Sequence, residues 1–422
     1  MLDRINPPEI SIPNAIHLHT PQSYKLKNGT PVYNICEGTQ EVVKIELIFA
    51  AGNAAASSSL LSTATNDLMD EGSTLHSSSE IAEALDYYGS YLHSENGVDW
   101  SSISLFSLNK FVSNTLPYFQ EIITQPLYPS KEIQTYKQQG KQRLSVNLTK
   151  VDYLARINFS ETLFGKNHPY GRVTKPEDYD LLDTVILKDY HEKKYKNGLK
   201  AVIVSGLANE KLIQEIINTI DKMGLKNGDL LSIAPEAYVP TKKFIEKEDA
   251  IQSAIRIGRR LFTRHHPDFI AFSVLNTILG GYFGSRLMAN IREDKGYTYG
   301  IGSGLVSNNF DGYFFITTEV GADVREAAVK EIYHEINRLK TEDINNEELT
   351  LVKNYLTGAF QRSIDGPFAL AEKQKMLLLN NLEINYLNDY LGKIKSITPQ
   401  KLREVANQYL NNVDLCEIIV GK

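Results

Sequence analysis

Cysteine is scarce in this sequence of 422 residues, which contains only Cys36 and Cys416. The two residues lie almost the whole chain apart and in no C-x-x-C spacing. This arrangement excludes a disulfide framework and a thiolate zinc site. We therefore expect both cysteines to be small, buried side chains.

Long apolar runs and an excess of positive charge are also missing. The longest charge-free stretches, Leu47–Asn66 and Phe269–Ser285, are interrupted by small and polar residues, which argues against a membrane span. The N-terminus carries no apolar stretch of the kind a secretory signal needs, so we expect a cytoplasmic protein. The 45 basic and 51 acidic residues give a net charge of −6 without a basic stripe, which argues against a nucleic-acid partner.

Histidines are present, but they are not spaced as zinc ligands. None of the nine lies four residues from another, the spacing that places two imidazoles on one helix face. His191 and His334 each begin an H-E-x-x sequence whose fifth residue is not histidine, so we interpret both as solvated helix faces. The remaining close pairs, which we interpret as surface residues, are His17-x-His19 and His265-His266.

Motifs for other kinds of chemistry are absent as well. The sequence has no G-x-S-x-G nucleophile elbow and no P-loop. Its one notable glycine-rich stretch, Gly280–Ser285, follows a predicted helix rather than a strand, which makes it a weak dinucleotide motif.

The sequence does contain an order of elements that occurs twice. Each half runs from a strand through helices, further strands and long helices to a closing apolar strand, at Lys200–Ser205 and at Leu415–Val420. We predict an α+β fold built by duplication. Two unrelated α+β domains are the alternative, because the halves share little residue identity. The expected parts are an arm at residues 1–20, a first half at 21–226, a linker at 227–243 and a second half at 244–422.

The most distinctive segment runs from Gly284 to Tyr299 and reads GSRLMANIREDKGYTY. It resembles the second-half pattern, S-R-L followed by I-R-E-x-x-G-x-x-Y, of the inverted-zinc metallopeptidases of the pitrilysin, insulysin and mitochondrial processing peptidase family. The H-P-Y-G-R loop at His168–Arg172 matches the first half of that family. The resemblance covers about residues 20–422 and implies two homologous halves, each a mostly antiparallel sheet packed with helices.

The resemblance fails where that family binds zinc. Active members carry H-x-x-E-H, but the corresponding positions run here from Thr63 to Asp67, with Asn66 in place of the base glutamate. The third ligand would be a glutamate near Gln142–Leu144, yet residues 133–160 contain no glutamate. Threonine and asparagine oxygens with one carboxylate make a poor zinc site, so we predict no metal in this chain.

Two residues of the family pattern remain, Arg292 and Tyr299. The resemblance implies that this pair reaches the scissile peptide in a partner's active site. A guanidinium and a phenol can both donate hydrogen bonds to a peptide carbonyl oxygen as it becomes an oxyanion. The alternative is structural: Arg292 forms a surface ion pair with Glu293 or Asp294, and Tyr299 fills the core.

Three functional hypotheses follow from this distribution of residues. Two-chain members of the family pair a zinc-bearing subunit with one that lacks the motif, so the resemblance implies a heterodimer that cuts unfolded peptides. The zinc would belong to the partner. The isolated chain would be inactive and would form a homodimer. A second hypothesis is a structural or assembly subunit resembling the core proteins of respiratory complexes. A third is a self-sufficient metallopeptidase with unusual ligands.

Overall fold

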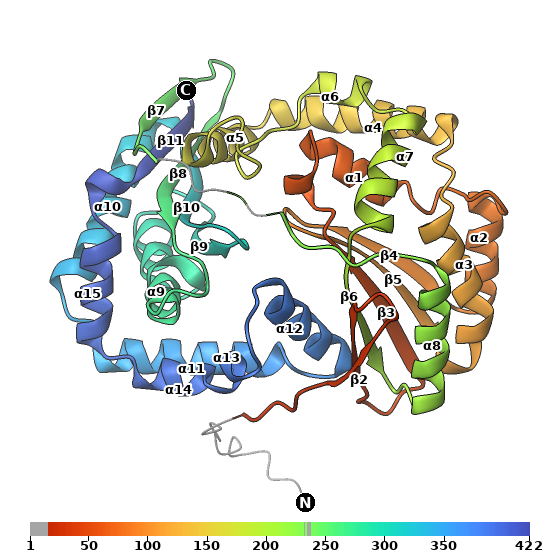
Figure 1. Ribbon diagram of the computed structural model, residues 1–422. Coiled ribbons are helices and arrows are strands. Elements are labelled where there is room, and N and C mark those ends of the chain that lie inside the picture. Colours follow the sequence, from red (N-terminus) through yellow and green to blue (C-terminus); the bar gives the residue numbers. More distant parts are fainter. Residues whose placement is uncertain (1–15, 232, 234–237) are drawn as a thin grey trace, which may run out of the picture.

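The computed structural model describes residues 16–231, 233 and 238–422. The predicted arm at 1–20 therefore lies outside the described residues up to residue 15, and the predicted linker at 227–243 does so at 232 and 234–237. The fold is α+β, as predicted, with two mixed sheets packed against helices (Figure 1).

The first sheet has six strands in the order β1-β2-β6-β3-β5-β4. The central strands β3 and β6 are rich in valine and isoleucine and almost wholly buried, whereas the edge strand β4 alternates exposed and half-buried residues. The bounds are β1 (Gln22–Lys25), β2 (Pro31–Ile35), β3 (Val42–Phe49), β4 (Tyr91–Asn96), β5 (Ser101–Leu108) and β6 (Leu199–Gly206).

The second sheet repeats this arrangement in the order β7-β11-β8-β10-β9. Its bounds are β7 (Lys242–Glu246), β8 (Gln252–Leu261), β9 (Ile301–Ser307), β10 (Gly312–Gly321) and β11 (Cys416–Gly421). In the first sheet β2 runs parallel to β6, and in the second sheet β7 runs parallel to β11; β6 and β11 are the last strands of their halves. The other corresponding pairs of neighbouring strands are antiparallel. The equal order and directions support a duplication, with β1 added at one edge.

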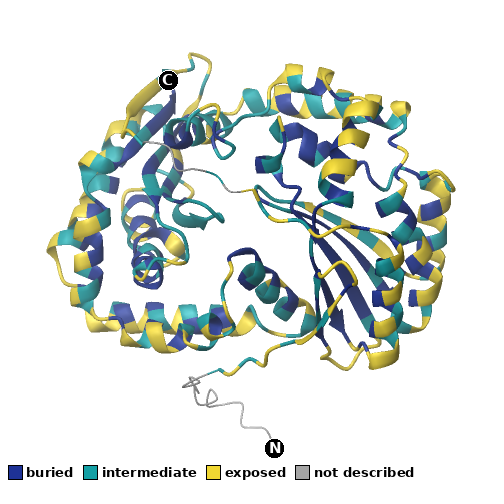
Figure 2. Ribbon diagram, in the orientation of Figure 1, coloured by how far each residue is buried: buried dark blue, intermediate teal, exposed yellow. Residues whose placement is uncertain are grey.

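The helices of the first half mostly cover one face of its sheet (Figure 1). Their bounds are α1 (Ser59–Asp67), α2 (Ser78–Tyr87), α3 (Val112–Thr124), α4 (Ser130–Leu148), α5 (Val151–Phe164), α6 (Pro176–Asp180), α7 (Thr184–His191) and α8 (Glu210–Lys222), with the short 3-10 helices η1 (Asn53–Ala55) and η2 (Asn109–Phe111) and the π-helix η3 (Glu192–Lys196). Figure 2 shows that buried residues follow the strands and the helix sides that face them. This is the pattern that apolar burial produces.

The second half has the same plan. Its helices are α9 (Phe269–Asn276), α10 (Arg325–Thr341), α11 (Asn346–Arg362), α12 (Pro367–Leu379), α13 (Asn385–Asn388), α14 (Tyr390–Ser396) and α15 (Pro399–Tyr409), with the π-helices η4 (Thr277–Gly281) and η5 (Met288–Asp294) and the short 3-10 helices η6 (Ala322–Val324) and η7 (Asn412–Asp414). The helices α9, α10 and α15 pack with the second sheet around an apolar core of their own. No described helix is long and apolar enough to cross a membrane.

The two halves exchange one helix each. Helix α5 of the first half lies on the second sheet, where Phe159 is buried among residues that include Cys416 and Ile418 of β11. Helix α12 of the second half lies on the first sheet, where Ala371 belongs to the same buried cluster as Ile203 of β6. Each sheet therefore depends on the other half for part of its cover.

A buried group of charges accompanies α12 on the first sheet. The Lys375 amine forms ion pairs of 2.9 Å with Glu46 of β3, 2.9 Å with Glu95 of β4 and 2.8 Å with Glu372. Burial alone would lower the pKa of Lys375, but the charges of Glu46 and Glu372 outweigh it and raise that pKa. The paired amine fixes where α12 sits on the sheet.

Two expectations about local structure were wrong. Cys36 follows β2 directly and is exposed, so only Cys416 is a buried cysteine. The predicted linker ends too late, because β7 already begins at Lys242, where its backbone pairs with Glu417 of β11.

Candidate functional site

Helix α1 carries the residues that correspond to the zinc motif. It begins after Ser58, whose side chain accepts a hydrogen bond from the Leu61 amide and so caps the helix. The chain before it passes Trp100 so closely at Gly52 that a Cβ there would lie 2.2 Å from a backbone nitrogen. This close approach holds the start of α1 against the strand region.

Thr63, at the first ligand position, is part of a polar network. Its hydroxyl accepts a 2.9 Å hydrogen bond from the Asn96 amide of β4, which also donates 2.9 Å to Asn53. The amide oxygen of Asn96 accepts from Ser62 at 2.7 Å. The polar atoms at this position are thus satisfied by neighbouring side chains.

Asn66, at the position of the base, is fully buried. Its side-chain oxygen accepts a 3.0 Å hydrogen bond from the Tyr195 hydroxyl, and its nitrogen donates 3.4 Å to the Ser102 carbonyl. An amide cannot take up a proton from water at neutral pH as a carboxylate does. Asn66 therefore has a structural role in the core.

Asp67, at the second histidine position, bonds to α4 instead of a metal. The Tyr136 hydroxyl donates a 3.0 Å hydrogen bond to its carboxylate. Desolvation raises the pKa of the Asp67 carboxyl, while the Tyr136 bond and the charge of Arg143 oppose that rise. Arg143 lies in the part of α4 where the sequence pattern placed the third ligand.

These residues do not fit a hydrolytic zinc ion. Zinc in such a site takes imidazole, thiolate or several carboxylates, and α1 offers one carboxylate beside a guanidinium. Across the described part of the chain, no group of three or more His, Cys, Asp and Glu side chains is placed to hold a metal. No hydrolytic step can be derived through a metal at α1.

A second polar cluster, which sequence analysis missed, lies beyond the end of α1. Ser73 donates a hydrogen bond to Glu121 of α3, and His76 Nδ1 lies 2.9 Å from the same carboxylate. The serine proton faces the carboxylate rather than the imidazole, so this is not a nucleophile–base pair. The cluster fastens the loop after α1 to α3.

Arg292 and Tyr299 lie in the second half, on either side of the turn that follows η5. Neither side chain makes a hydrogen bond or ion pair with a residue that the structure describes. The Arg292 guanidinium lies 4.7 Å from the centre of the Phe283 ring. Tyr299 is 95% exposed, so it does not fill the core, and the expected alternative for Arg292, an ion pair with Glu293 or Asp294, is not formed.

A polar cavity of about 450 Å³ adjoins Tyr299. Asp152 and Arg156 of α5 form one wall, while Arg256 and Glu319 of the second sheet form another. No residue of α1 lines this cavity. Of Arg292 and Tyr299, only Tyr299 lines it.

The two histidines that begin an H-E-x-x sequence differ in burial. His191 was expected on a solvated face but is buried, and its Nε2 lies 2.8 Å from the Ile123 carbonyl. Burial lowers the pKa of His191 to about 4. His334 is exposed, as expected. The sequence could not distinguish the two, because both begin the same H-E-x-x pattern on amphipathic helices.

Comparisons with known proteins show which proteins this chain is similar to. Residues 186–356 match the sequence family described as "Peptidase M16 inactive domain". A protein of Rickettsia felis named uncharacterized zinc protease is 23% identical over 415 residues, which cover 94% of this chain and 92% of the relative. The Helicobacter pylori protein named non-peptidase homolog YmxG is 22% identical over 393 residues, covering 89% of this chain and 88% of the relative.

Solved structures share the fold. The crystal structure of a peptidase M16 inactive domain from Pseudomonas fluorescens superposes with a TM-score of 0.88 at 23% identity, covering 95% of this chain and 98% of the other. A chain of complex III2 from Candida albicans superposes with a TM-score of 0.75 at 16% identity, covering 95% of each chain.

Proposed function

Because the chain belongs to the M16 peptidase family, we propose that it is the zinc-free subunit of a two-chain peptidase. In this proposal Arg292 and Tyr299 enter the active site of a partner that carries the zinc motif. The substrate is an unfolded peptide held between the two chains.

The observation that carries the proposal is the contrast between the two sites. At α1 the polar atoms of Thr63 and Asn66 are hydrogen-bonded within the chain. Arg292 and Tyr299 have no hydrogen-bond partner among the residues that the structure describes, and Tyr299 is 95% exposed. Side chains that are hydrogen-bonded within the chain support folding, whereas the half-buried Arg292 and the exposed Tyr299 keep polar groups that are available to a second molecule.

The chemistry expected of the pair is electrostatic. As the scissile carbonyl gains negative charge, the Arg292 guanidinium and the Tyr299 hydroxyl donate hydrogen bonds to its oxygen. The pair contributes no nucleophile and no metal, which is why a partner is required.

Exposed aromatic groups support an interface on this side. Phe283, which carries the Arg292 guanidinium on its ring, is 66% exposed. Tyr299 is a second large ring that this chain leaves uncovered. Aromatic and arginine side chains are common at the centre of interfaces. The isolated chain would also use this surface to form a homodimer.

The proposal is tested by mixing the purified chain with an M16 protein from the same organism that carries H-x-x-E-H. Co-elution of the two chains and cleavage of a peptide that neither chain cuts alone are expected. The respiratory-complex-like alternative predicts instead a stable large assembly with no zinc-bearing M16 chain in it. Absence of both co-elution and activity with every such protein of the organism contradicts the proposal.

A further inference from the structure

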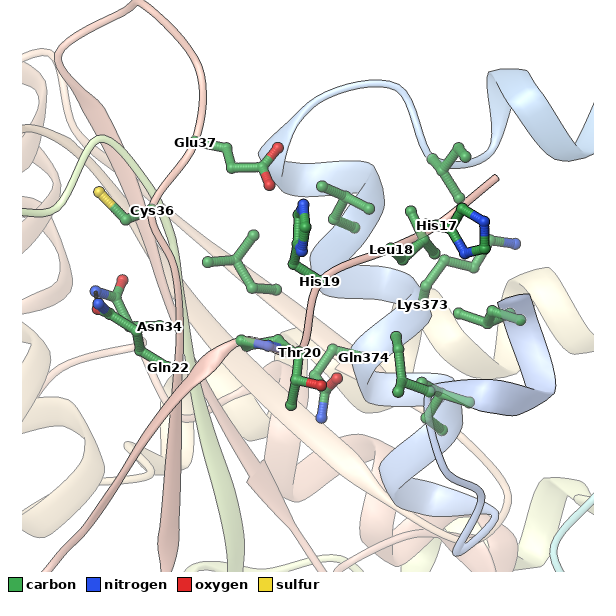
Figure 3. A pocket seen from close by; sticks show the side chains of 17 residues that line it. His17, Leu18, His19, Thr20, Gln22, Asn34, Cys36, Glu37, Lys373 and Gln374 are labelled. Atoms are coloured by element: carbon green, nitrogen blue, oxygen red, sulfur yellow. Dashed lines mark hydrogen bonds between the residues drawn. The ribbon is translucent and has the colours of Figure 1, made fainter. Parts of the chain in front are cut away.

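A cavity of about 400 Å³ lies between the segment leading into β1 and the helices α12 and α13 (Figure 3). One wall consists of residues 17–22 and 34–37 of the first half, and the other belongs to the second half. Neither Arg292 nor Tyr299 lines it, and no residue of α1 does. Its volume falls in the range of about 300–1,000 Å³ that is typical of small-ligand sites.

Seven of the seventeen residues that line the cavity are leucine or isoleucine. Such a surface favours a ligand with branched apolar groups, because burying them removes apolar area from water. The aliphatic lining residues are Leu18, Ile35, Ile364, Leu370, Leu377, Ile384 and Leu387.

One lining residue, Lys373, brings an unbalanced positive charge. Its amine makes no hydrogen bond or ion pair with any described residue, whereas Lys375 on the same helix pairs with three carboxylates. Burial and the nearby charge of Arg264 lower the pKa of Lys373. Among the described lining residues only Glu37 carries a carboxylate, and Figure 3 shows it near His19 rather than near the amine.

Hydroxyl and amide groups make up much of the rest of the lining. Thr20, Gln22, Asn34 and Gln374 all line the cavity. The side-chain oxygen of Asn34 is buried and accepts no hydrogen bond. These groups match the alternating donors and acceptors of a peptide main chain better than the tail of a simple fatty acid, which has neither.

We propose that this cavity binds the carboxyl-terminal end of a short aliphatic peptide. The terminal carboxylate pairs with Lys373, the aliphatic side chains lie against the leucine and isoleucine wall, and the main chain bonds to the amide groups. Because both halves line the cavity, the bound peptide joins the segment before β1 to α12. The inference is independent of the proposed zinc-bearing partner.

Isothermal titration of the full chain with N-acetyl-Leu-Leu and with its carboxyl-terminal amide tests the proposal. The acid is expected to bind at least about tenfold more tightly than the amide, since a half-buried charge pair depends on both charges. Lys373→Met should remove this preference, while Lys188→Met, on the exposed surface of α7, should leave it intact. Leu370→Gln should weaken both peptides.

Octanoate separates a peptide end from a free fatty acid, because it has the carboxylate and the chain but no amide groups. Binding of octanoate as tight as that of N-acetyl-Leu-Leu would overturn the assignment to a peptide. So would equal binding of acid and amide, an unchanged preference in Lys373→Met with a native circular dichroism spectrum, or no binding of either peptide.

Discussion

The Tyr136 hydroxyl of α4 donates a 3.0 Å hydrogen bond to the Asp67 carboxylate at the end of α1. These are the two helices that the family pattern expects to meet at a zinc ion. Here they meet through a phenol and a carboxylate, with the charge of Arg143 close enough to act on Asp67. A cationic side chain at this place opposes the entry of a divalent metal.

The first prediction concerns zinc. Because α1 lacks imidazole ligands, the chain purified without chelator should contain far less than one zinc ion per molecule by elemental analysis. Added zinc should leave its melting temperature unchanged, since a metal stabilises a fold only by binding the native state more tightly. Stoichiometric zinc that survives dialysis, or a melting temperature lowered by a chelator, would show that the reading of α1 is wrong.

The second prediction concerns the pH dependence of stability through His191. The pKa of His191 is about 4 in the folded chain, below the ordinary histidine value of 6.5. At a pH between these two values the unfolded state therefore binds the proton more readily than the folded state does. The contribution of His191 is therefore complete above about pH 6.5 and is lost as the pH falls towards 4.

Urea unfolding at pH 7 and pH 4 measures this contribution. His191→Gln keeps a side-chain donor for the Ile123 carbonyl but cannot titrate. The stability advantage of the wild type over this variant should shrink by about 2–3 kcal/mol between pH 7 and pH 4. His334→Gln, at an exposed position of the same sequence pattern, serves as the matched control. An advantage that stays constant with pH would refute the assignment.

The third prediction concerns the exchanged helix α12. Lys375→Met removes the cation that Glu46 faces in the buried sheet surface, leaving Lys44, 2.8 Å away, as the remaining partner of that carboxylate. We expect a loss of about 3 kcal/mol in the free energy of unfolding, at the lower end of the range for a broken buried pair. Equilibrium denaturation in urea gives this value directly.

A double variant distinguishes the ion pair from simple packing. Lys375→Met combined with Glu46→Gln should cost less than the sum of the two single changes, because the second change removes a charge that the first left unpaired. Strictly additive losses would mean that Lys375 contributes only its aliphatic chain to α12.

Sequence patterns predict the strands and helices of this fold better than they predict which helix packs on which sheet. The strand at Val42–Phe49 and the closing strand at Cys416–Gly421 are predictable, because β-branched apolar runs between turn residues have few other solutions. The exchange of α5 and α12 is not, since an amphipathic helix shows the same period whichever sheet it covers. The sequence does not predict the strand β7, because two lysines and a glutamate among its five residues hide the apolar pattern of a strand.

Sequence also predicts only part of the candidate site. Loss of the zinc ligands is visible at Thr63, Asn66 and Asp67 without any structure. The partners that fill the space are not, because Asn96 and Tyr136 lie on elements distant in sequence. The exposure of Tyr299 likewise depends on how the turn after η5 projects from the second sheet, which no local pattern encodes.

Single-turnover peptidase rates of the mixed complex, with the affinity of the two chains measured alongside, test whether Arg292 and Tyr299 act in a partner's active site. Arg292→Ala and Tyr299→Phe should each slow cleavage, with Arg292→Ala at least about 100-fold slower, while the affinity between the chains stays close to that of the wild type. Tyr87→Phe, an exposed tyrosine of α2, is the control. An undiminished rate in a complex containing Arg292→Ala would contradict the account.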